Sequence, residues 1–216
     1  MLRIASIIIV ITVVSLSTIT VLMNVYAQEQ QLQQQQYSFV TQWGSEGSES
    51  GQFMGHNDVV PSHDGRYMFV PDYENHRIQK FTANGTYIME WGSGSESTTN
   101  GEFDNPHSID VDLLGNVYVA DYDNNRIQKF SDDGTFITEW GTEGEDTGQF
   151  NNPAGVAVDS EDNVYVTDVN NNRIQKFSSD GTFITSWGSE GEGEGQFLGP
   201  EGLDVDSEGN VYVAYG

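Results

Sequence analysis

Beyond residue 36, apolar and polar residues alternate in short segments that Gly, Asn or Asp residues separate. The pattern predicts four consecutive strands over residues 108–112, 116–121, 126–131 and 135–140. A hairpin turn is predicted at Ser131 to Gly134, because glycine readily adopts the positive φ that such turns require. No apolar period of 3.6 residues persists after residue 27. The pattern therefore predicts an all-β fold.

The same pattern returns along the chain with a period of about 48 residues. Residues 115–141 and 162–188 agree at 21 of 27 positions, a looser copy covers residues 65–92, and a partial copy begins at Gly209. The repeat contains one tryptophan per unit, at intervals of 48, 49 and 47 residues: Trp43, Trp91, Trp140 and Trp187. Four antiparallel strands per unit, followed by a long connection to the next unit, are typical of a propeller blade.

The repeated segments read N-V-Y-V-x-D and N-N-R-I-Q-K-F, followed by D-G-T-F and, after the tryptophan, by G-Q-F. This pattern resembles the NHL-repeat β-propellers, and the likeness covers residues 37–216. The resemblance implies a β-propeller of four-stranded antiparallel NHL-type blades, with about four blades present. It implies little about activity, because propellers carry many unrelated functions.

The repeats divide residues 37–216 into units 37–86, 87–135, 136–182 and a partial unit 183–216. Ser38 to Gly44 is predicted to be a fourth strand without the rest of its blade, and the last unit ends within its second strand. Family members commonly close with about six blades. A truncated chain, an open arc and a ring completed by self-association with a second copy are all compatible with this count, and we favour truncation.

The N-terminal segment predicts export. Arg3 precedes a nearly uninterrupted apolar run over residues 4–26, and Val25 to Ala27 fits a signal-peptidase site. We expect a signal peptide over residues 1–27, with an uncleaved membrane anchor as the alternative. A Gln-rich linker follows at residues 28–36. Either way the propeller is expected to be secreted or on the cell surface, with a membrane contact only through an uncleaved N-terminal segment.

Charge limits the classes of partner. The chain has 33 Asp and Glu residues against 8 Lys and Arg, and a formal net charge of −25. Six of the basic residues lie in three copies of R-I-Q-K and never form a cluster, which argues against nucleic acid as a partner. A cation or a basic partner is compatible with this charge, as are simple solubility and adaptation to salt. The sequence has no Cys and so offers no disulfide or thiolate zinc site, and we therefore do not expect the ubiquitin-ligase function of propellers that follow zinc-binding domains.

Two recurring groups of residues are interpreted as structural. An Asp, whose carboxylate can accept turn N–H groups, and an Arg five residues later recur as Asp72 with Arg77, Asp121 with Arg126, and Asp168 with Arg173. A single active site would need such residues only once. The aromatic residues Trp43, Trp91, Trp140, Trp187, Tyr118, Tyr165 and Tyr212 also recur, which favours packing between blades over ligand stacking.

Successive loops of a blade alternate between its two faces. The connections between blades and the loops between second and third strands therefore lie on one face, which we call the top face. The connections cover residues 44–55, 92–105, 141–152 and 188–200 and hold eleven acidic residues. Such oxygen ligands suit Ca²⁺. No connection has the D-x-D-x-D-G spacing of a calcium loop, so solvated loops are the preferred interpretation.

Residues that differ between repeats are better candidates for specificity. The first innermost-strand position, at the mouth of the central channel, holds Asn57, His107, Ala154 and Glu201 in the four units, and this channel mouth is the predicted binding site. A metal site is conceivable from residues His56, His107, Glu143, Glu145 and Asp146, with Ca²⁺ or Zn²⁺ as the ion. No cofactor is required, and no catalytic residue is assigned.

Two functional hypotheses follow. The first is a non-catalytic binding or scaffold module that takes an unidentified protein or small ligand on its acidic top face. The second is a metal-dependent lyase or hydrolase that resembles the peptidyl-amidoglycine lyase or lactonase propellers. The lyases of this type use several channel histidines around zinc, and only His107, with His56 beside Asn57, stands at the corresponding place here. The first hypothesis is therefore preferred.

Overall fold

The structure is a computed structural model that describes residues 39–55 and 58–215. The predicted signal peptide and linker, together with His56 and Asn57, lie outside the described residues. Within the described part of the chain, no helix has the length and apolar character needed to cross a membrane. Residues 42–216 form one compact unit, to which the description below applies.

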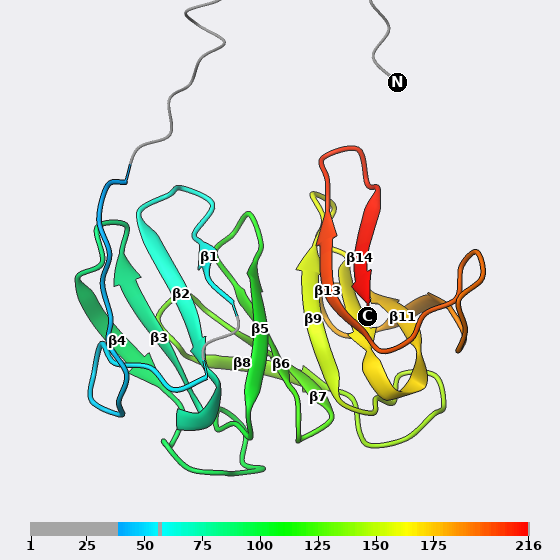
Figure 1. Cartoon of the computed structure of the whole chain (residues 1–216), viewed down its shortest axis with the longest axis horizontal. Helices are drawn as coiled ribbons and strands as arrows, with labels where there is room; N and C mark the ends of the chain where they lie inside the picture. The colour runs from blue at the N-terminus through cyan, green and yellow to red at the C-terminus, as the bar shows by residue number, and fades with distance from the viewer. Residues whose placement is uncertain (1–38, 56–57, 216) are drawn as a thin grey trace, which may run out of the picture. The chain divides into compact units, whose positions relative to one another are not determined.

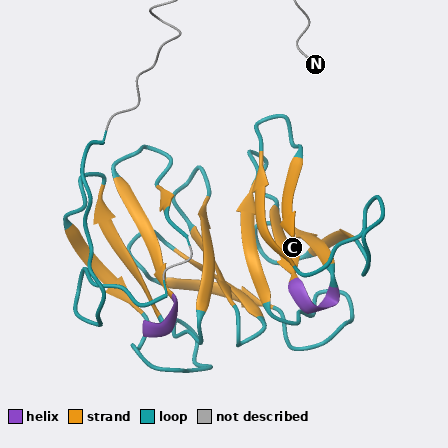
Figure 2. Cartoon of the chain, in the orientation of Figure 1, coloured by secondary structure: helices purple, strands orange, loops and turns teal. Residues whose placement is uncertain are grey.

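Fourteen strands in the described ranges form successive antiparallel sheets (Figures 1 and 2). The first blade contains β1 (Val60–Pro61), β2 (Tyr67–Asp72), β3 (Arg77–Thr82) and β4 (Tyr87–Trp91). The second contains β5 (Pro106–Val111), β6 (Val117–Asp121), β7 (Arg126–Phe130) and β8 (Phe136–Trp140). The third contains β9 (Pro153–Val158), β10 (Val164–Asp168), β11 (Arg173–Phe177) and β12 (Phe183–Trp187), and the fourth contains β13 (Pro200–Val205) and β14 (Val211–Tyr215). Short 3₁₀ turns, η1 (Tyr73–Asn75) and η2 (Val169–Asn171), follow β2 and β10.

The strand pairing repeats from blade to blade. In each complete sheet the strands lie in sequence order, and the ladder of the second and third strands begins at an Asp–Arg pair, such as Asp121 opposite Arg126. The hairpin predicted at Ser131 to Gly134 is present, with Gly134 at φ +77° and its N–H donating to the Ser131 carbonyl at 3.0 Å. The predicted all-β fold of four-stranded antiparallel blades is confirmed, with two strands of the fourth blade described.

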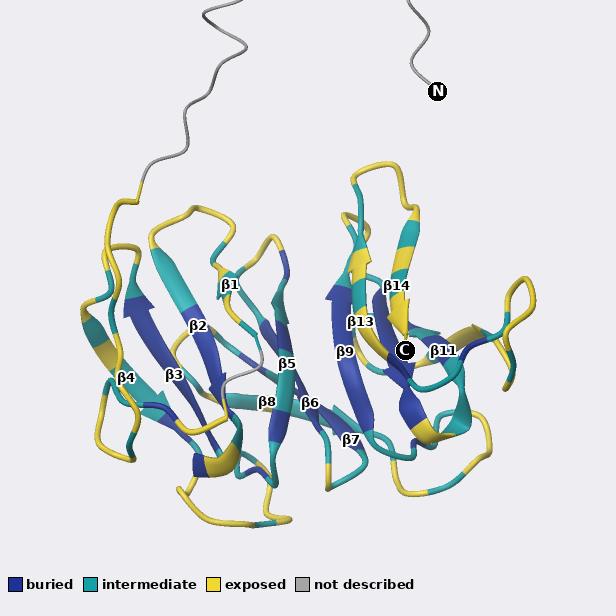
Figure 3. Ribbon diagram, viewed as in Figure 1, coloured by how far each residue is buried: buried dark blue, intermediate teal, exposed yellow. Residues whose placement is uncertain are grey.

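The hydrophobic core lies between blades (Figure 3). One cluster combines Phe69 and Ile78 of the first blade with Ile109 and Val119 of the second. The next cluster combines the face of the second blade that carries Tyr118 with residues of β9, β10 and β11. The second blade thus buries its two faces against the first and third blades, which explains why its second strand, β6, is apolar at nearly every position.

The recurring tryptophans bridge neighbouring blades. Trp91 at the end of β4 packs on Phe130 of β7 with 5.9 Å between ring centroids, and Trp140 at the end of β8 packs on Phe177 of β11 at the same distance. The expected interblade packing is therefore present for these residues. It is absent for Tyr212, which is 58% exposed, whereas Tyr118 is fully buried. The reason is that no described strand covers the outer face of β14.

Residues 39–44 form no strand, so the fourth strand predicted from Ser38 to Gly44 is wrong over its described part. A fourth strand is held by hydrogen bonds to the third strand of its blade, and no unpaired third strand is present among the described residues. Trp43 nevertheless keeps the packing role of its counterparts, with its ring centroid 4.5 Å from that of Phe81.

Candidate functional site

The innermost strands β1, β5, β9 and β13 lie side by side in this order. His107 and Glu201 occupy the second positions of β5 and β13 and are partly or fully accessible, whereas Ala154 at the same position of β9 is completely buried. Ala154 therefore offers no surface to a ligand. Asn57, the fourth member of the predicted channel mouth, lies outside the described residues.

Carboxylates connect the inner strands to one another. Asp58 Oδ2 accepts hydrogen bonds from Ser108 Oγ at 2.8 Å and from the Ile109 N–H at 3.2 Å. Asp110 Oδ2 accepts a hydrogen bond of 2.6 Å from the N–H of Val158 in the next blade. Burial raises the pKa of the Asp110 carboxyl to about 6, and the nearby charges of Asp204 and Asp58 act in the same direction. These side chains fix the spacing of the inner strands and make the surface between them acidic.

Three aromatic rings from two blades meet beside these carboxylates. His107 stacks on Tyr122, with 5.4 Å between ring centroids and 26° between planes. Tyr73 in η1 meets His107 edge-on at 5.9 Å and Tyr122 at 6.4 Å. Tyr73 and Tyr122 follow the second strands of their blades, whereas His107 belongs to an innermost strand. The cluster therefore lies where the top face meets the channel mouth.

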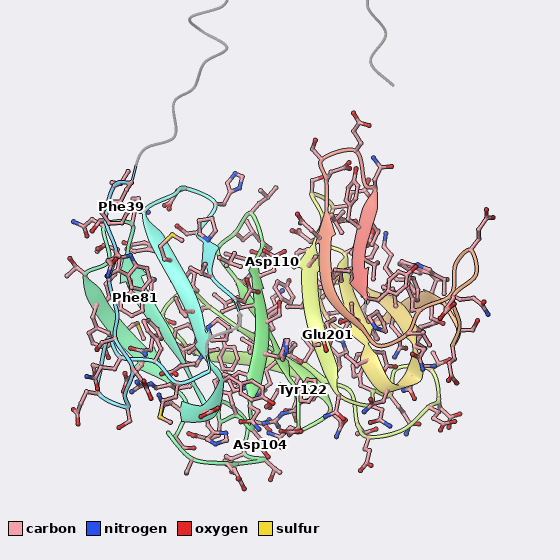
Figure 4. The ribbon with its side chains drawn as sticks, in the orientation of Figure 1. Phe39, Phe81, Asp104, Asp110, Tyr122 and Glu201 are labelled. Carbon is pink, nitrogen blue, oxygen red and sulfur yellow. The ribbon has the colours of Figure 1, made fainter. Side chains whose placement is uncertain are left out.

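A depression of about 370 Å³ lies between the inner strands and is lined by residues that include Asp58, His107, Ser108 and Glu201. Burial lowers the pKa of His107, although the negative charges of Glu201 and Asp58 oppose this shift. The imidazole is therefore neutral at neutral pH and does not repel a cation. Figure 4 shows Asp110 on β5, Glu201 on β13 and Tyr122 at the end of β6. We call Tyr73, His107, Tyr122, Asp58 and Glu201 the aromatic–acidic site.

A larger depression of about 900 Å³ lies along the first blade. Trp43, Phe53, Met54 and Val70 form its apolar part, and Asp58 is shared with the smaller depression. Gly55 and Asp58 both line this depression, and the two residues between them lie outside the described part of the chain. We base no site on it for this reason.

The basic residues of the described ranges are all engaged elsewhere. Each one forms an ion pair with an acid of the scaffold: Arg66 with Asp64, Arg77 with Asp72, Lys80 with Asp132, Arg126 with Asp121, Lys129 with Asp112, Arg173 with Asp168, and Lys176 with Asp159. Within residues 39–55 and 58–215, no Lys or Arg pairs with Asp58, Asp110 or Glu201. The negative charge of the aromatic–acidic site is therefore not neutralised by a described basic side chain.

The recurring Asp–Arg element lies inside the blades. Asp121 is fully buried and accepts hydrogen bonds from the Asp104 N–H, Asn124 Nδ2, Arg126 Nε and Gln128 Nε2. Arg126 also donates to the carbonyls of Thr98, Thr99 and Glu102 and so ties the connection between blades to the sheet. Asp72 with Arg77, and Asp168 with Arg173, repeat these bonds. The element thus has the bonding of a structural support for the top-face connections.

The acidic residues proposed from the third connection are dispersed on its surface. Glu143, Glu145 and Asp146 are exposed, and Arg173 contacts the last two through their backbone carbonyls rather than their carboxylates. The described structure does not place them in a group with His107. They therefore offer no shared coordination geometry with the channel mouth.

A different group of potential ligands comes together across the first two blades. One ligand atom each from His76, Glu96 and Asp104 lies within 4.8 Å of the others, and this is the one such group of three among residues 39–55 and 58–215. Burial, with the charges of Asp123 and Glu96, raises the pKa of Asp104. Sequence reasoning missed this group, although two positions show the signal: the repeats carry Asn125 or Asn172 in place of His76, and Asn151 or Leu198 in place of Asp104.

The comparisons with known proteins identify the repeat. The NHL repeat model matches residues 103–130 and 150–177, which span the first three strands of the second blade (β5 to β7) and of the third blade (β9 to β11). These segments are NHL repeats. No curated protein sequence matches the chain significantly. The predicted NHL-type propeller fold is therefore supported by the repeat model and, independently, by the blade structure described above.

Solved structures with similar folds are propellers of diverse kinds. A streptogramin B lyase structure is 20% identical with a TM-score of 0.60, and the match covers 82% of this chain and 52% of that one. The nidogen/laminin complex contains a chain 20% identical with a TM-score of 0.57, covering 76% of this chain and 56% of that one. A putative gluconolactonase is 16% identical with a TM-score of 0.56, covering 74% and 57%. The chain spans about half the length of these structures, and at such identities the likeness shows the fold alone.

Proposed function

We propose that this NHL-repeat chain is an exported, non-catalytic binding module that takes a positively charged group of a protein or small ligand at the aromatic–acidic site. The observation that carries the proposal is the stacking of His107 on Tyr122, with Tyr73 against both, beside carboxylates that no described Lys or Arg neutralises. Export is inferred from the N-terminal sequence.

The chemistry of the site supports a cationic ligand. The face of an aromatic ring attracts an ammonium or guanidinium group, and the carboxylates of Asp58 and Glu201, which line one depression with His107, add direct charge attraction. The partial burial of His107 reduces the competition from water, which strengthens both interactions. A cation placed between Glu201 and the Tyr122 ring would thus gain more than one placed on a solvated acidic loop.

The position of the site in the repeats supports a role in specificity. Val169 takes the place of Tyr122 in the third blade, and Ala154 takes the place of His107. Glu201 stands at the same repeat position as His107 and Ala154, neither of which is acidic. Residues that only support the fold are kept from blade to blade, as in the Asp–Arg element. In the aromatic–acidic site, Tyr73 and Tyr122 occupy equivalent positions of the first two blades, whereas Asp58, His107 and Glu201 differ from their counterparts in the other units.

The alternative is a metal-dependent lyase or hydrolase, and the matched streptogramin B lyase and putative gluconolactonase are the observations in its favour. That alternative requires a reactive centre at the channel. In the part of the chain that the structure describes, the group of three potential ligands includes His76 rather than His107. A binding module requires only the surface described above, so we prefer it.

A binding experiment with matched charge variants tests the proposal. The probe is a fluorescein-labelled tetralysine peptide at 150 mM salt, with tetramethylammonium chloride as a competing small cation. Glu201→Gln is expected to weaken binding about 3- to 30-fold, which corresponds to the energy of one desolvated charge contact. Glu192→Gln removes an exposed carboxylate from another top-face connection and should leave binding unchanged.

Equal effects of the two variants would show general electrostatic attraction and would contradict the proposal, as would the absence of binding at this salt concentration. Competition by tetramethylammonium would indicate a small-ligand site. Peptide binding without such competition would indicate that the protein takes an extended basic segment. Both of these outcomes support a cation site.

A further inference from the structure

We propose that His76, Glu96 and Asp104 form a binding site for a divalent transition-metal ion of the zinc class, which connects the first two blades on the top face. His76 follows η1 in the first blade. Glu96 and Asp104 lie on the connection from β4 to β5. This site shares no residue with the aromatic–acidic site and does not depend on the proposed function.

The spacing of the ligand atoms fits one ion. His76 Nδ1 and Asp104 Oδ1 are 3.4 Å apart. Two ligand atoms at about 2.1 Å from a tetrahedral zinc ion are separated by roughly 3.4 Å, so this pair already has the spacing of two ligands. Glu96 is exposed, and its ligand atom lies within 4.8 Å of the other two. A small rotation of this free side chain brings the third oxygen to the ion.

The connection that carries Glu96 differs from its counterparts. Phe103 follows Trp91 by 12 residues, whereas 10 residues separate the equivalent Trp and Phe in the other units. The other three connections contain a short parallel bridge, such as Glu143 with Phe150, and the described structure gives no such bridge in this one. The two additional residues therefore change the course of this connection and place Glu96 beside His76.

The replacement of Asn by His at position 76 adds a metal ligand without removing the structural role of the position. Asn125 Oδ1 accepts the N–H of Asn152, and Asn172 Oδ1 accepts the N–H of Gly199. His76 Nδ1 accepts the N–H of Asn105 at 3.1 Å in the same way. The metal-free protein thus keeps the hydrogen bond of this position, and a metal ion on Nδ1 takes its place.

The composition of the group selects the kind of ion. One imidazole with two carboxylates suits zinc and neighbouring transition metals, whereas calcium prefers six or more oxygens. Asp123 adds a further negative charge beside the site. Its carboxylate is held there by a 2.6 Å hydrogen bond from Asn105 Nδ2. His76 and Asp104 have 13% and 25% of their side chains exposed, so an ion can enter from solvent.

The test uses tag-free full-length protein, freed of metal with EDTA, and zinc chloride as the probe. Equilibrium dialysis with elemental analysis is expected to show one zinc ion per chain and a raised midpoint of thermal unfolding. The His76→Asn variant places the residue of the other repeats at this position. It should retain the fold and bind zinc at least about tenfold more weakly. His63→Asn removes an exposed histidine elsewhere and should bind like the wild type.

A Co²⁺-loaded sample offers a second readout, because its visible absorption reports the ligand set and should change in Asp104→Asn. Unaltered zinc binding in His76→Asn would overturn the proposal. So would a stoichiometry below one ion per chain, an equal loss in His63→Asn, or calcium binding in preference to zinc. The proposal is supported if metal-free His76→Asn melts at the temperature of the metal-free wild type and zinc does not raise the melting temperature of the variant.

Discussion

The indole of Trp140 covers Gly181 in the neighbouring blade. A Cβ built on Gly181 would lie 2.7 Å from Trp140 Cδ2, which is closer than such atoms approach in real structures. Gly134 has the same relationship to Trp91, and Gly85 to Trp43. The glycine of each D-G-T or N-G-T turn therefore serves two purposes: it supplies the positive φ of the hairpin, and it leaves room for the tryptophan of the preceding blade.

This relationship predicts that Gly181→Ala destabilises the protein more than an alanine at an open glycine. Gly148 has a similar positive φ and no neighbouring atom within 4 Å of a built Cβ, so Gly148→Ala carries backbone strain alone, about 1 kcal/mol. Gly181→Ala is expected to cost about 1–3 kcal/mol more because the indole must move. Urea denaturation of the two variants measures the difference, and equal losses would show that Trp140 is not held against the turn.

The recurring Asp–Arg element predicts a large loss of stability from Asp121→Ala. The variant leaves the largely buried Arg126 without its main carboxylate partner and removes the acceptor for four hydrogen-bond donors, at a cost of about 3–5 kcal/mol. Glu139 also contacts Arg126 but is 33% exposed, so Glu139→Ala should cost about 1 kcal/mol or less. Thermal unfolding of both variants is the measurement. A small effect of Asp121→Ala would contradict the structural role.

The half-buried Asp110 predicts a component of stability that falls as pH rises. Its pKa in the folded protein is about 6, above the ordinary value of 3.8, so between these values the folded protein binds more protons than the unfolded chain. This contribution is fully present below about pH 4 and is lost as pH rises through 6. The shift of about two units corresponds to about 3 kcal/mol.

Asp110→Asn should remove this component. The difference in unfolding free energy between variant and wild type is expected to move in favour of the variant by up to about 3 kcal/mol from pH 4 to pH 7 in urea denaturation. Asparagine keeps one of the two acceptor oxygens, so one of the hydrogen bonds from the Val111 and Val158 N–H groups is lost, and this loss shifts the whole curve nearly independently of pH. Glu192→Gln, which changes an exposed acid, serves as the control. A pH-independent difference between Asp110→Asn and the wild type would contradict the burial of a titrating carboxyl.

The strands could be predicted from the sequence because each depends on neighbouring residues. The segments predicted at 116–121 and 135–140 correspond to β6 (Val117–Asp121) and β8 (Phe136–Trp140), since alternation and turn glycines define them locally. The lone strand from Ser38 to Gly44 failed because a strand also needs a partner. Tyr212 appeared equivalent to Tyr118 in sequence, yet its burial depends on a neighbouring blade.

The candidate sites could be predicted only in part. His107 and Glu201 were identified because they interrupt the repeat at the channel mouth. Tyr73 and Tyr122 were missed, since their contact with His107 depends on how two blades pack. The group of His76 and Asp104 also joins two blades across 28 positions of sequence, and the same search for residues that interrupt the repeat would have found both.

The most direct measurement of the central claim is the affinity of the labelled tetralysine peptide for Tyr122→Val. Valine is the residue of the third blade at this position, Val169, so the variant should keep the fold while it removes the ring on which His107 stacks. We expect fluorescence anisotropy at 150 mM salt to show binding about 3- to 30-fold weaker than in the wild type, with the melting temperature little changed. Unchanged affinity in a folded Tyr122→Val protein would contradict the claim that this site binds a cation.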